Sequence, residues 1–448
     1  MKRRAFLKGS AMILAAAGAS DILHAAPLAA PEAEPVPDES PEGAEGALIV
    51  SAPMLQNYAE NSIGIVFAVS ALANGYVLIG EKPDLSDARK VKCGGFRTTA
   101  LDDKVSQIRV SGLKPSTTYY YRIGADRIHY GNGYNMKILG NEEASEIYSF
   151  KTAGAKSAGH FCVINDTHVH WDTMTKLTDK IDALAPSCVI WNGDISNREE
   201  KIGNLIKIYL KPEMERKDYA SRIPYLLCPG NHDQRGRANR RLEDVWMFRQ
   251  NEERSPRDWD LGRNFAVRMG DVALIGLDTG EDKLDTNPLF AGLFNNGAYR
   301  EAQTLWLKDV LKRKEIAKAP YLVAFCHIPL FDPREDANPG DIAPADTDPR
   351  YTTDYAAWQR TCARMWAPLL EKAHCQLVIT GHQHCFRYDE PTKDRPWAQI
   401  VGGGPHLKPG KGFPTLIEGQ VRDGKLVITV HDIATDTIPG TFTFKPRR

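Results

Sequence analysis

The chain has 448 residues, more than a single typical domain core, and 42% of them are hydrophobic, which allows substantial burial. Lys plus Arg and Asp plus Glu number 57 each, so the formal net charge is zero. This balance gives no overall field that would attract a nucleic acid or an acidic membrane.

The N-terminal segment is typical of an export signal followed by a spacer. A pair of arginines precedes Phe-Leu-Lys and a short apolar run at 11–19. Residues 1–30 resemble a twin-arginine signal peptide, and the apolar run is too short for a comfortable membrane span. Residues 31–46 are acidic and rich in Pro, with too little apolar surface to fold. We therefore expect a periplasmic or extracellular protein with no membrane contact once the signal is removed.

Residues 47–154 predict a small all-β sandwich. Leu113-Lys114-Pro115 before a Tyr-rich stretch resembles the fibronectin type III pattern. We expect a structural role or a wall of the substrate cleft, and binding of a glycan or a partner stays open. Turn-rich segments separate the strand-like stretches, which are 63–69, 76–80, 106–110, 119–123 and 147–151.

Residues 159–448 alternate between strand-like and helix-like segments, which predicts an α/β domain with helices on both sides of a sheet. Four of the eight cysteines lie in the strand-like runs, where we expect buried free thiols. The apolar runs that suit strands buried on both faces are 161–164, 188–191, 225–228, 321–326 and 376–380. The segments with helical spacing are 173–184, 204–210, 302–311 and 356–372.

A polar cluster follows each of the five apolar runs. In such folds ligands bind beyond the carboxyl ends of the strands, so the clusters can meet at one edge. One cluster alone would be weak evidence, because Asp, His and Asn cap many loops, but five in this order are hard to explain as caps. The clusters are Asp166-Thr167-His168, Gly193-Asp194, Gly230-Asn231-His232-Asp233, His327, and Gly381-His382-Gln383-His384.

Two carboxylates, four imidazoles and one amide suit Zn, Mn or Fe better than Ca or Mg. The pattern of clusters resembles the calcineurin-like metallophosphoesterase superfamily over roughly residues 159 to 446. The resemblance implies a four-layer α/β/β/α sandwich that binds two divalent metal ions. It assigns Asp166, His168 and His384 to the first metal, Asn231, His327 and His382 to the second, and Asp194 to both.

An all-β domain before such a catalytic domain is the layout of the purple acid phosphatases, so the resemblance narrows to a subgroup similar to them. The purple enzymes bind ferric iron through the Tyr of Gly-Asp-x-x-Tyr and begin with Asp-x-Gly. This chain has Asn197 in place of that Tyr, and His168, in place of the Gly, can supply a ligand. We therefore expect a colourless centre.

The resemblance implies hydrolysis of a phosphorylated small molecule, preferably a phosphomonoester, by a hydroxide that bridges the metals. His232 would assist the leaving group, and Asp233 would orient His232. A phosphodiesterase or nucleotide hydrolase with the same centre stays open, as does a non-catalytic, metal-stabilised binding protein. The connections 280–296 and 331–355 are long enough to form cleft walls. Candidate substrate contacts are His170, Arg198, Arg235 and Arg387. The leaving alcohol and the oligomeric state do not follow from the sequence.

Overall fold

The structure is a computed structural model that describes residues 46–93, 102–132, 134–250, 261–285, 287, 293–332, 349–408 and 412–447, without the side chains of 349–360. The predicted signal segment 1–30 and nearly all of the spacer 31–46 lie outside the described residues. In the part of the chain that is described, no helix combines the length and the apolar character needed to cross a membrane.

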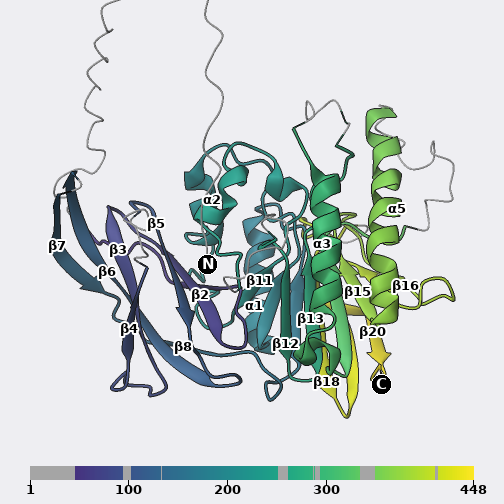
Figure 1. Ribbon diagram of the computed structural model, residues 1–448, viewed down its shortest axis with the longest axis horizontal. Coiled ribbons are helices and arrows are strands. Elements are labelled where there is room, and N and C mark those ends of the chain that lie inside the picture. Colours follow the sequence, from purple (N-terminus) through teal and green to yellow (C-terminus); the bar gives the residue numbers. More distant parts are fainter. Residues whose placement is uncertain are drawn as a thin grey trace, which may run out of the picture. The chain divides into compact units, whose positions relative to one another are not determined.

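Two sheets dominate the described residues (Figure 1). The larger has the strand order β20 (Thr437–Phe444), β19 (Lys425–Asp432), β18 (Thr415–Arg422), β9 (His160–Ile164), β10 (Cys188–Trp191), β11 (Tyr225–Leu227), β1 (Met54–Gln56), β2 (Ser62–Ala68), β5 (Val105–Ser111). The smaller has the order β12 (Phe265–Met269), β13 (Val272–Leu277), β14 (Tyr321–Cys326), β15 (Leu377–Thr380), β17 (Ala398–Val401), β16 (Arg387–Asp389). Strands β9 to β11 are parallel, as are β13, β14, β15 and β17, so each group presents its carboxyl ends along one edge.

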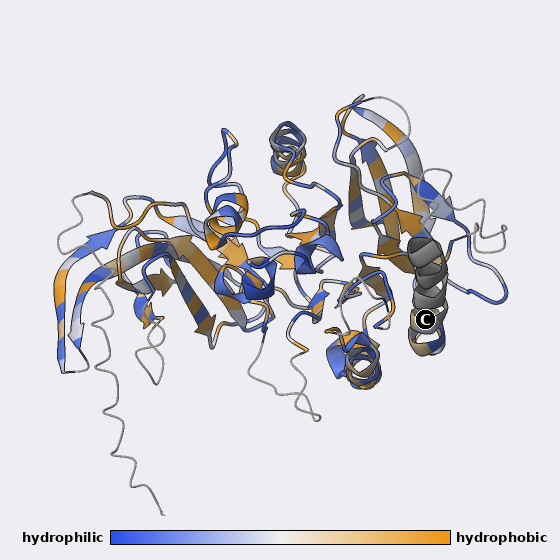
Figure 2. Cartoon of the chain, turned by 90° about the horizontal axis from the view of Figure 1, so that it is seen from above, coloured by the Kyte–Doolittle hydropathy of each residue, from blue (hydrophilic) through white to orange (hydrophobic). Residues whose placement is uncertain are grey.

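The two sheets pack face to face, and helices cover their outer faces. The rings of Phe161 in β9 and Phe325 in β14 meet edge to face in the core between the sheets, with centroids 6.0 Å apart. Helices α1 (Trp171–Leu184) and α2 (Ile202–Tyr209) pack on the larger sheet, and α3 (Asn296–Val310) and α5 (Pro349–Lys372) pack on the smaller one. The predicted α/β/β/α sandwich and its five buried strands are confirmed. Accordingly, much of the length of the central strands is coloured as hydrophobic in Figure 2.

The strands of the N-terminal third form a sandwich that shares a sheet with the C-terminal part. Strand β1 pairs in parallel with β11 and antiparallel with β2, which carries the larger sheet into this region. A further sheet of β4 (Arg89–Lys92), β3 (Ala73–Gly80), β6 (Thr118–Asn132) and β7 (Asn135–Glu143), with β8 (Tyr148–Lys151) on β6, contributes to the same apolar core. The fibronectin type III resemblance and the boundaries 47–154 and 159–448 stay predictions.

Several elements differ from the expected ones. Helix α3 begins at Asn296 rather than 302, because the carboxylate of Asp285 accepts hydrogen bonds from the backbone N–H groups of Asn296 and Gly297, at 2.9 and 2.8 Å. Helix α5 begins at Pro349 rather than 356, so the end of the predicted loop 331–355 is helical. Residues 286, 288–292 and 333–348 of the two predicted cleft walls lie outside the described part. The short helical elements are α4 (Lys314–Ala317), η2 (His232–Gln234) and η3 (Asn239–Asp244).

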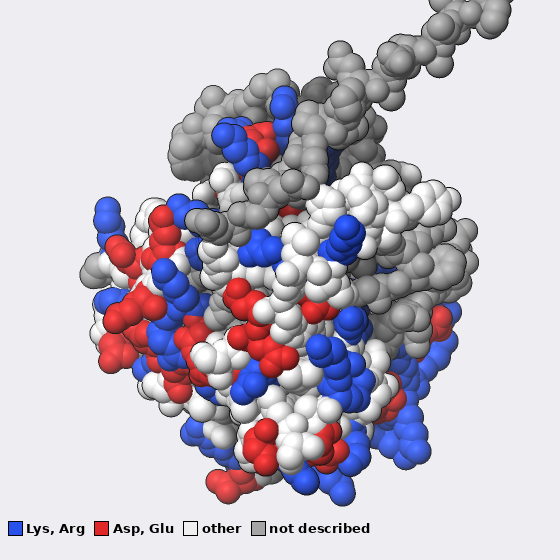
Figure 3. Space-filling view, turned by 90° about the vertical axis from the view of Figure 1, so that its left-hand side faces the viewer, with Lys and Arg blue, Asp and Glu red and all other residues white. Residues whose placement is uncertain are grey.

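Charges of both signs intermingle on the described surface shown in Figure 3. In the N-terminal third, Lys114 and Glu81 form an ion pair at 2.7 Å, and Arg122 and Glu143 lie 3.6 Å apart. Four cysteines in or directly after strands of the C-terminal part are buried free thiols, as predicted: Cys162, Cys188, Cys228 and Cys326.

Candidate metal centre

In the polar clusters that follow the strands, many residues have positive φ, a backbone conformation that residues other than glycine rarely adopt. Such conformations cost on the order of 1–3 kcal/mol per residue and persist only where the surrounding structure enforces them, which is typical of functional sites. Five of the seven predicted metal ligands have positive φ: Asp166 (50°), His168 (44°), Asp194 (51°), His382 (71°) and His384 (48°).

Glycines next to the ligands allow their close approach. A Cβ on Gly381 would lie 2.5 Å from Oδ2 of Asp166, and a Cβ on Gly193 would overlap the imidazole of His327. The glycines of the Gly-Asp and Gly-His motifs are therefore required by packing. Gly403, which follows β17 and which the sequence analysis did not single out, has φ of 93°, and a Cβ there would also overlap Oδ2 of Asp166.

Two groups of metal-type ligands form beyond the carboxyl ends of the strands. In the first, Nε2 of His384 lies 3.0 Å from Nε2 of His168 and 3.4 Å from Oδ1 of Asp166. In the second, Asp194, His327 and His382 converge, and Nε2 of His327 lies 3.1 Å from Oδ2 of Asp194. The larger sheet contributes both carboxylates and the smaller sheet contributes three of the four imidazoles, so the centre lies between the two sheets.

The two groups are adjacent. Oδ2 of Asp194 is 3.7 Å from Nε2 of His168, and Oδ1 of Asp166 is 3.8 Å from Nε2 of His327. Asn231 places its Oδ1 3.1 Å from Nδ1 of His382. The fold thus brings together all seven residues that the sequence analysis assigned to metals.

Two asparagines orient two of the four imidazoles. Nδ1 of His168 donates to Oδ1 of Asn197 at 2.8 Å, and Nδ1 of His327 donates to the carbonyl of Asn192 at 2.9 Å. Each bond leaves Nε2 as the nitrogen that faces the other ligands. The orienting roles of Asn192 and Asn197 were not predicted, although both lie within the stretch around Gly193-Asp194.

The electrostatics of the centre favour cations. Burial disfavours protonation of His327, but the carboxylates of Asp194 and Asp166 outweigh it and raise the pKa of its imidazole to about 10. Burial likewise disfavours a charged Asp194, yet His327 holds the pKa of this carboxyl well below its usual value. Buried carboxylates that hold a neighbouring proton this strongly, within a set of four imidazoles, fit divalent ions such as Zn, Mn or Fe.

His232 lies at the edge of the centre, its ring centroid 5.1 Å from that of His168. Its Nε2 is 3.2 Å from Nη1 of Arg235, and its Nδ1 is 3.3 Å from the carbonyl of Asn197. Because a guanidinium can only donate, Nε2 of His232 accepts this hydrogen bond and the proton is on Nδ1. The His232 ring is therefore held between Arg235 and Asn197, and its leaving-group role stays a prediction.

Asp233 has a different role from the predicted one. Its carboxylate accepts hydrogen bonds from the backbone N–H groups of Gly230, Ile195 and Ser196, at 2.9, 3.1 and 3.0 Å. The hydroxyl of Ser196 also donates to this carboxylate. Among the described residues, the Asp233 carboxylate has no hydrogen bond to the His232 ring. Asp233 therefore holds the loops after β10 and β11 together instead of orienting His232.

A second acidic cluster faces the centre from the end of β13. The guanidinium of Arg235 contacts Glu281 at 2.5 and 3.0 Å and Asp282 at 3.1 Å, and Oδ2 of Asp282 is 3.9 Å from Nε2 of His382. Glu281 is completely buried. Burial raises the pKa of its carboxyl to about 7. These residues follow a buried strand just as the predicted clusters do, and that signal could have identified them.

The other candidate substrate contacts have different surroundings. Arg387 donates to Asp389 at 2.9 and 3.1 Å and to the carbonyl of Phe331 at 2.9 Å, so its charge is largely matched. Arg198 is exposed. The ring of His170 packs edge to face against His406, with centroids 4.5 Å apart.

The family model for calcineurin-like phosphoesterases matches residues 159–386, about half of the chain. The chain belongs to this family. The match begins at the start of β9 and ends directly after the Gly-His-x-His cluster, so it includes every ligand of the centre described above.

Purple acid phosphatases are among the relatives of this calcineurin-like phosphoesterase. Purple acid phosphatase 21 of Arabidopsis thaliana is 21% identical over 295 residues, which cover 64% of this chain and 54% of that protein. The chain thus spans about half the length of this curated relative. The structure of purple acid phosphatase PPD1 from yellow lupin (Lupinus luteus) seeds has a TM-score of 0.59 at 13% identity, covering 88% of this chain and 74% of its own. The structure of PhoD has a TM-score of 0.55 at 13% identity, covering 88% of both chains, and at this identity the likeness is one of fold.

Proposed function

We propose that this protein hydrolyses phosphomonoesters with two divalent metal ions. The observation that carries the proposal is the meeting of two ligand groups, one around Asp166 and one around Asp194, with Oδ2 of Asp194 within 3.7 Å of imidazole nitrogens of both. A carboxylate shared in this way is what a dinuclear site needs, because it compensates part of the charge of two neighbouring cations.

Asp166, His168 and His384 would hold one ion, Asn231, His327 and His382 the other, and Asp194 both. When bound, two such ions polarise the phosphoryl group and make a water molecule more acidic. The chain's own part is to orient this set. Asn192 and Asn197 fix the imidazoles of His327 and His168, and Asp233 fixes the loops that carry Asp194 and Asn231.

His232 and Arg235 would act together on the leaving oxygen. The imidazole is held between Arg235 and the carbonyl of Asn197, while Glu281 and Asp282 fix the guanidinium from the opposite sheet. The charge of Arg235 is matched by these two carboxylates, so its proposed part is to orient the His232 imidazole toward the departing alcohol. This arrangement favours catalysis over mere capture of a phosphorylated ligand, because binding alone requires no such pair.

The substrate class is tested with metal-replete protein and two chromogenic esters, 4-nitrophenyl phosphate and bis(4-nitrophenyl) phosphate. We expect faster turnover of the monoester and loss of both metal and activity in Asp194→Asn. Asp423→Asn, an equal charge change in the turn between β18 and β19, is the matched control. Preference for the diester would replace the proposal with a phosphodiesterase, and turnover of neither ester would favour a non-catalytic binding protein.

We also propose export to the periplasm or beyond by the twin-arginine route. The support is the sequence of residues 1–30, with Arg3 and Arg4 before an apolar run. Replacing both arginines by lysine should retain the protein in the cytoplasm. Unchanged export of that variant would contradict this route.

A further inference from the structure

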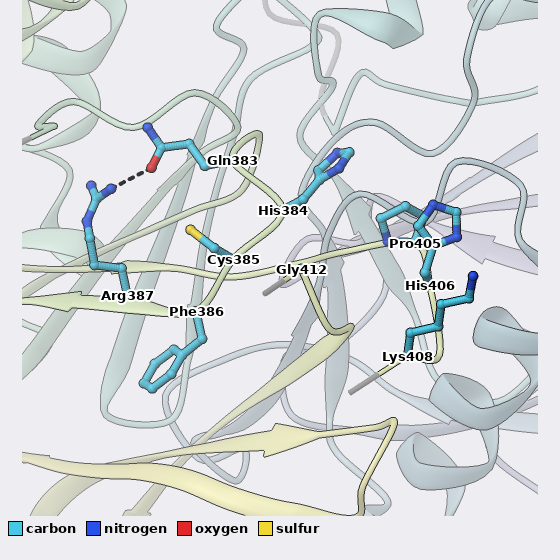
Figure 4. A pocket seen from close by; sticks show the side chains of 9 residues that line it. All are labelled: Gln383, His384, Cys385, Phe386, Arg387, Pro405, His406, Lys408 and Gly412. Carbon is cyan, nitrogen blue, oxygen red and sulfur yellow. Dashed lines mark hydrogen bonds between the residues drawn. The ribbon is translucent and has the colours of Figure 1, made fainter. Parts of the chain in front are cut away.

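A cavity of about 630 Å³ adjoins the metal centre at His384. This volume lies within the range of small-molecule sites. Figure 4 shows its two walls, with Gln383, Phe386 and Arg387 on one side, Pro405, His406 and Lys408 on the other, and His384 and Cys385 between them. A ligand in this cavity would therefore reach a residue of the first ligand group directly.

The cavity is cationic on one wall. Its lining contains Arg387, His406 and Lys408 and no Asp or Glu. Arg387 is already bound by Asp389, whereas no acidic side chain of the described residues forms an ion pair with Lys408 or His406. The backbone N–H of Lys408 donates to the carbonyl of His406 at 2.7 Å, and this tight turn holds the two side chains next to each other. A cation without a counter-charge on a cavity wall attracts anions.

The rest of the lining fits a carbon skeleton. Pro405 offers apolar surface between His384 and the cationic turn, and Phe386 and Cys385 offer apolar surface on the other side of His384. The His170 ring supports His406 from behind, with centroids 4.5 Å apart. The cavity therefore presents a metal ligand, apolar surface on both sides of that ligand, and a pair of side chains on one wall that can donate hydrogen bonds to an anion.

We propose that this cavity binds the alcohol part of the substrate and that Lys408 and His406 bind a second anionic group on it, a carboxylate or a second phosphate. The inference rests on the proposed phosphoesterase function and narrows its substrate class to phosphate esters of acidic alcohols. Lys408 and His406 act as specificity residues, because neither belongs to the seven metal ligands or to the His232–Arg235 pair.

Binding of phosphonates, whose C–P bond is not hydrolysed, tests the inference without turnover. Calorimetry on the full, metal-loaded chain compares 4-carboxyphenylphosphonate with its analogue 4-carbamoylphenylphosphonate, in which a neutral amide replaces the carboxylate. A third probe, with a second phosphonate in place of the carboxylate, tests for binding of a second phosphate. We expect Lys408→Ala to lower the preference for the charged probe about three- to fivefold, the size of one partly exposed ionic contact. Lys408→Ala combined with His406→Gln should lower it further. Lys425→Ala, at the start of β19, is the control with the same loss of charge and should leave the ratio unchanged.

Turnover of the matching phosphate esters separates this inference from the proposed function. If the charged phosphonate binds in preference and Lys408→Ala removes the preference, the cavity inference holds even where no ester is hydrolysed, and only the proposed function fails. If esters are hydrolysed but the wild-type protein shows no preference for the acidic probe, or keeps it in the double variant, the cavity inference is overturned and the proposed function stands. Loss of the preference at high salt is a further expected result, because the contact is ionic and partly exposed.

Discussion

Gly403→Ala is the substitution that most directly tests whether backbone packing shapes the metal centre. Gly403 has φ of 93°, and a Cβ at this position would fall well inside 3.0 Å of Oδ2 of Asp166 and 2.9 Å from Cβ of Asn165. Alanine at such a φ costs on the order of 1–3 kcal/mol. The Asp166 carboxylate must in addition move by about 1 Å, and a displacement of this size costs roughly 100-fold in turnover. A disturbed ligand also lowers metal affinity, by about 10- to 100-fold for changes next to the coordinating residues.

Gly112→Ala is the matched control, since Gly112 has φ of 74° and no atom would lie within 4 Å of its Cβ. It should lose about 1 kcal/mol of stability and keep normal metal content and turnover per folded molecule. The measurements are the free energy of unfolding in urea, the metal content after gel filtration, and the turnover of 4-nitrophenyl phosphate. If Gly403→Ala bound metal and turned over substrate like Gly112→Ala, the argument that Gly403 positions Asp166 would be refuted.

Three further predictions concern other residues. His232→Ala should lower turnover by about 100-fold or more with metal content intact, and normal turnover would remove His232 from the mechanism. Hydrogen bonds from His160 and His431, at 3.0 and 3.1 Å, hold the pKa of the Glu418 carboxyl well below its usual 4.5. A lowered folded-state pKa stabilises the fold above pH 4.5, and this stabilisation is lost progressively as the pH falls further, so Glu418→Gln should cost about 1–3 kcal/mol at pH 7 and less near pH 3. Urea unfolding at both pH values measures this, and an equal cost at both would contradict it. Iron-loaded protein should show no strong visible absorption, because Asn197 stands where the purple enzymes have Tyr, and an intense band would require another phenolate ligand.

Much of the centre could be predicted because its ligands follow strands that can be recognised from the local sequence. The runs that became β9, β10, β11, β14 and β15 are apolar throughout and short, which suits strands buried on both faces. Parallel strands bring their carboxyl ends to the same edge, so Asp166, Asp194 and Asn231 were expected to meet. The start of α3 was missed because its cap, Asp285, lies 11 residues before the helix.

The sequence by itself determined which residues could bind metals, since residue type and position after a strand are local properties. The tertiary structure decided what surrounds them. Arg235 lies in the chain beside His232, but its partners Glu281 and Asp282 arrive from the other sheet, and Gly403 approaches Asp166 from β17. Asp233 adjoins His232 in sequence yet bonds to the loop after β10. Such contacts join residues far apart in the chain, and they depend on how the two sheets stack, which no local pattern of side chains encodes.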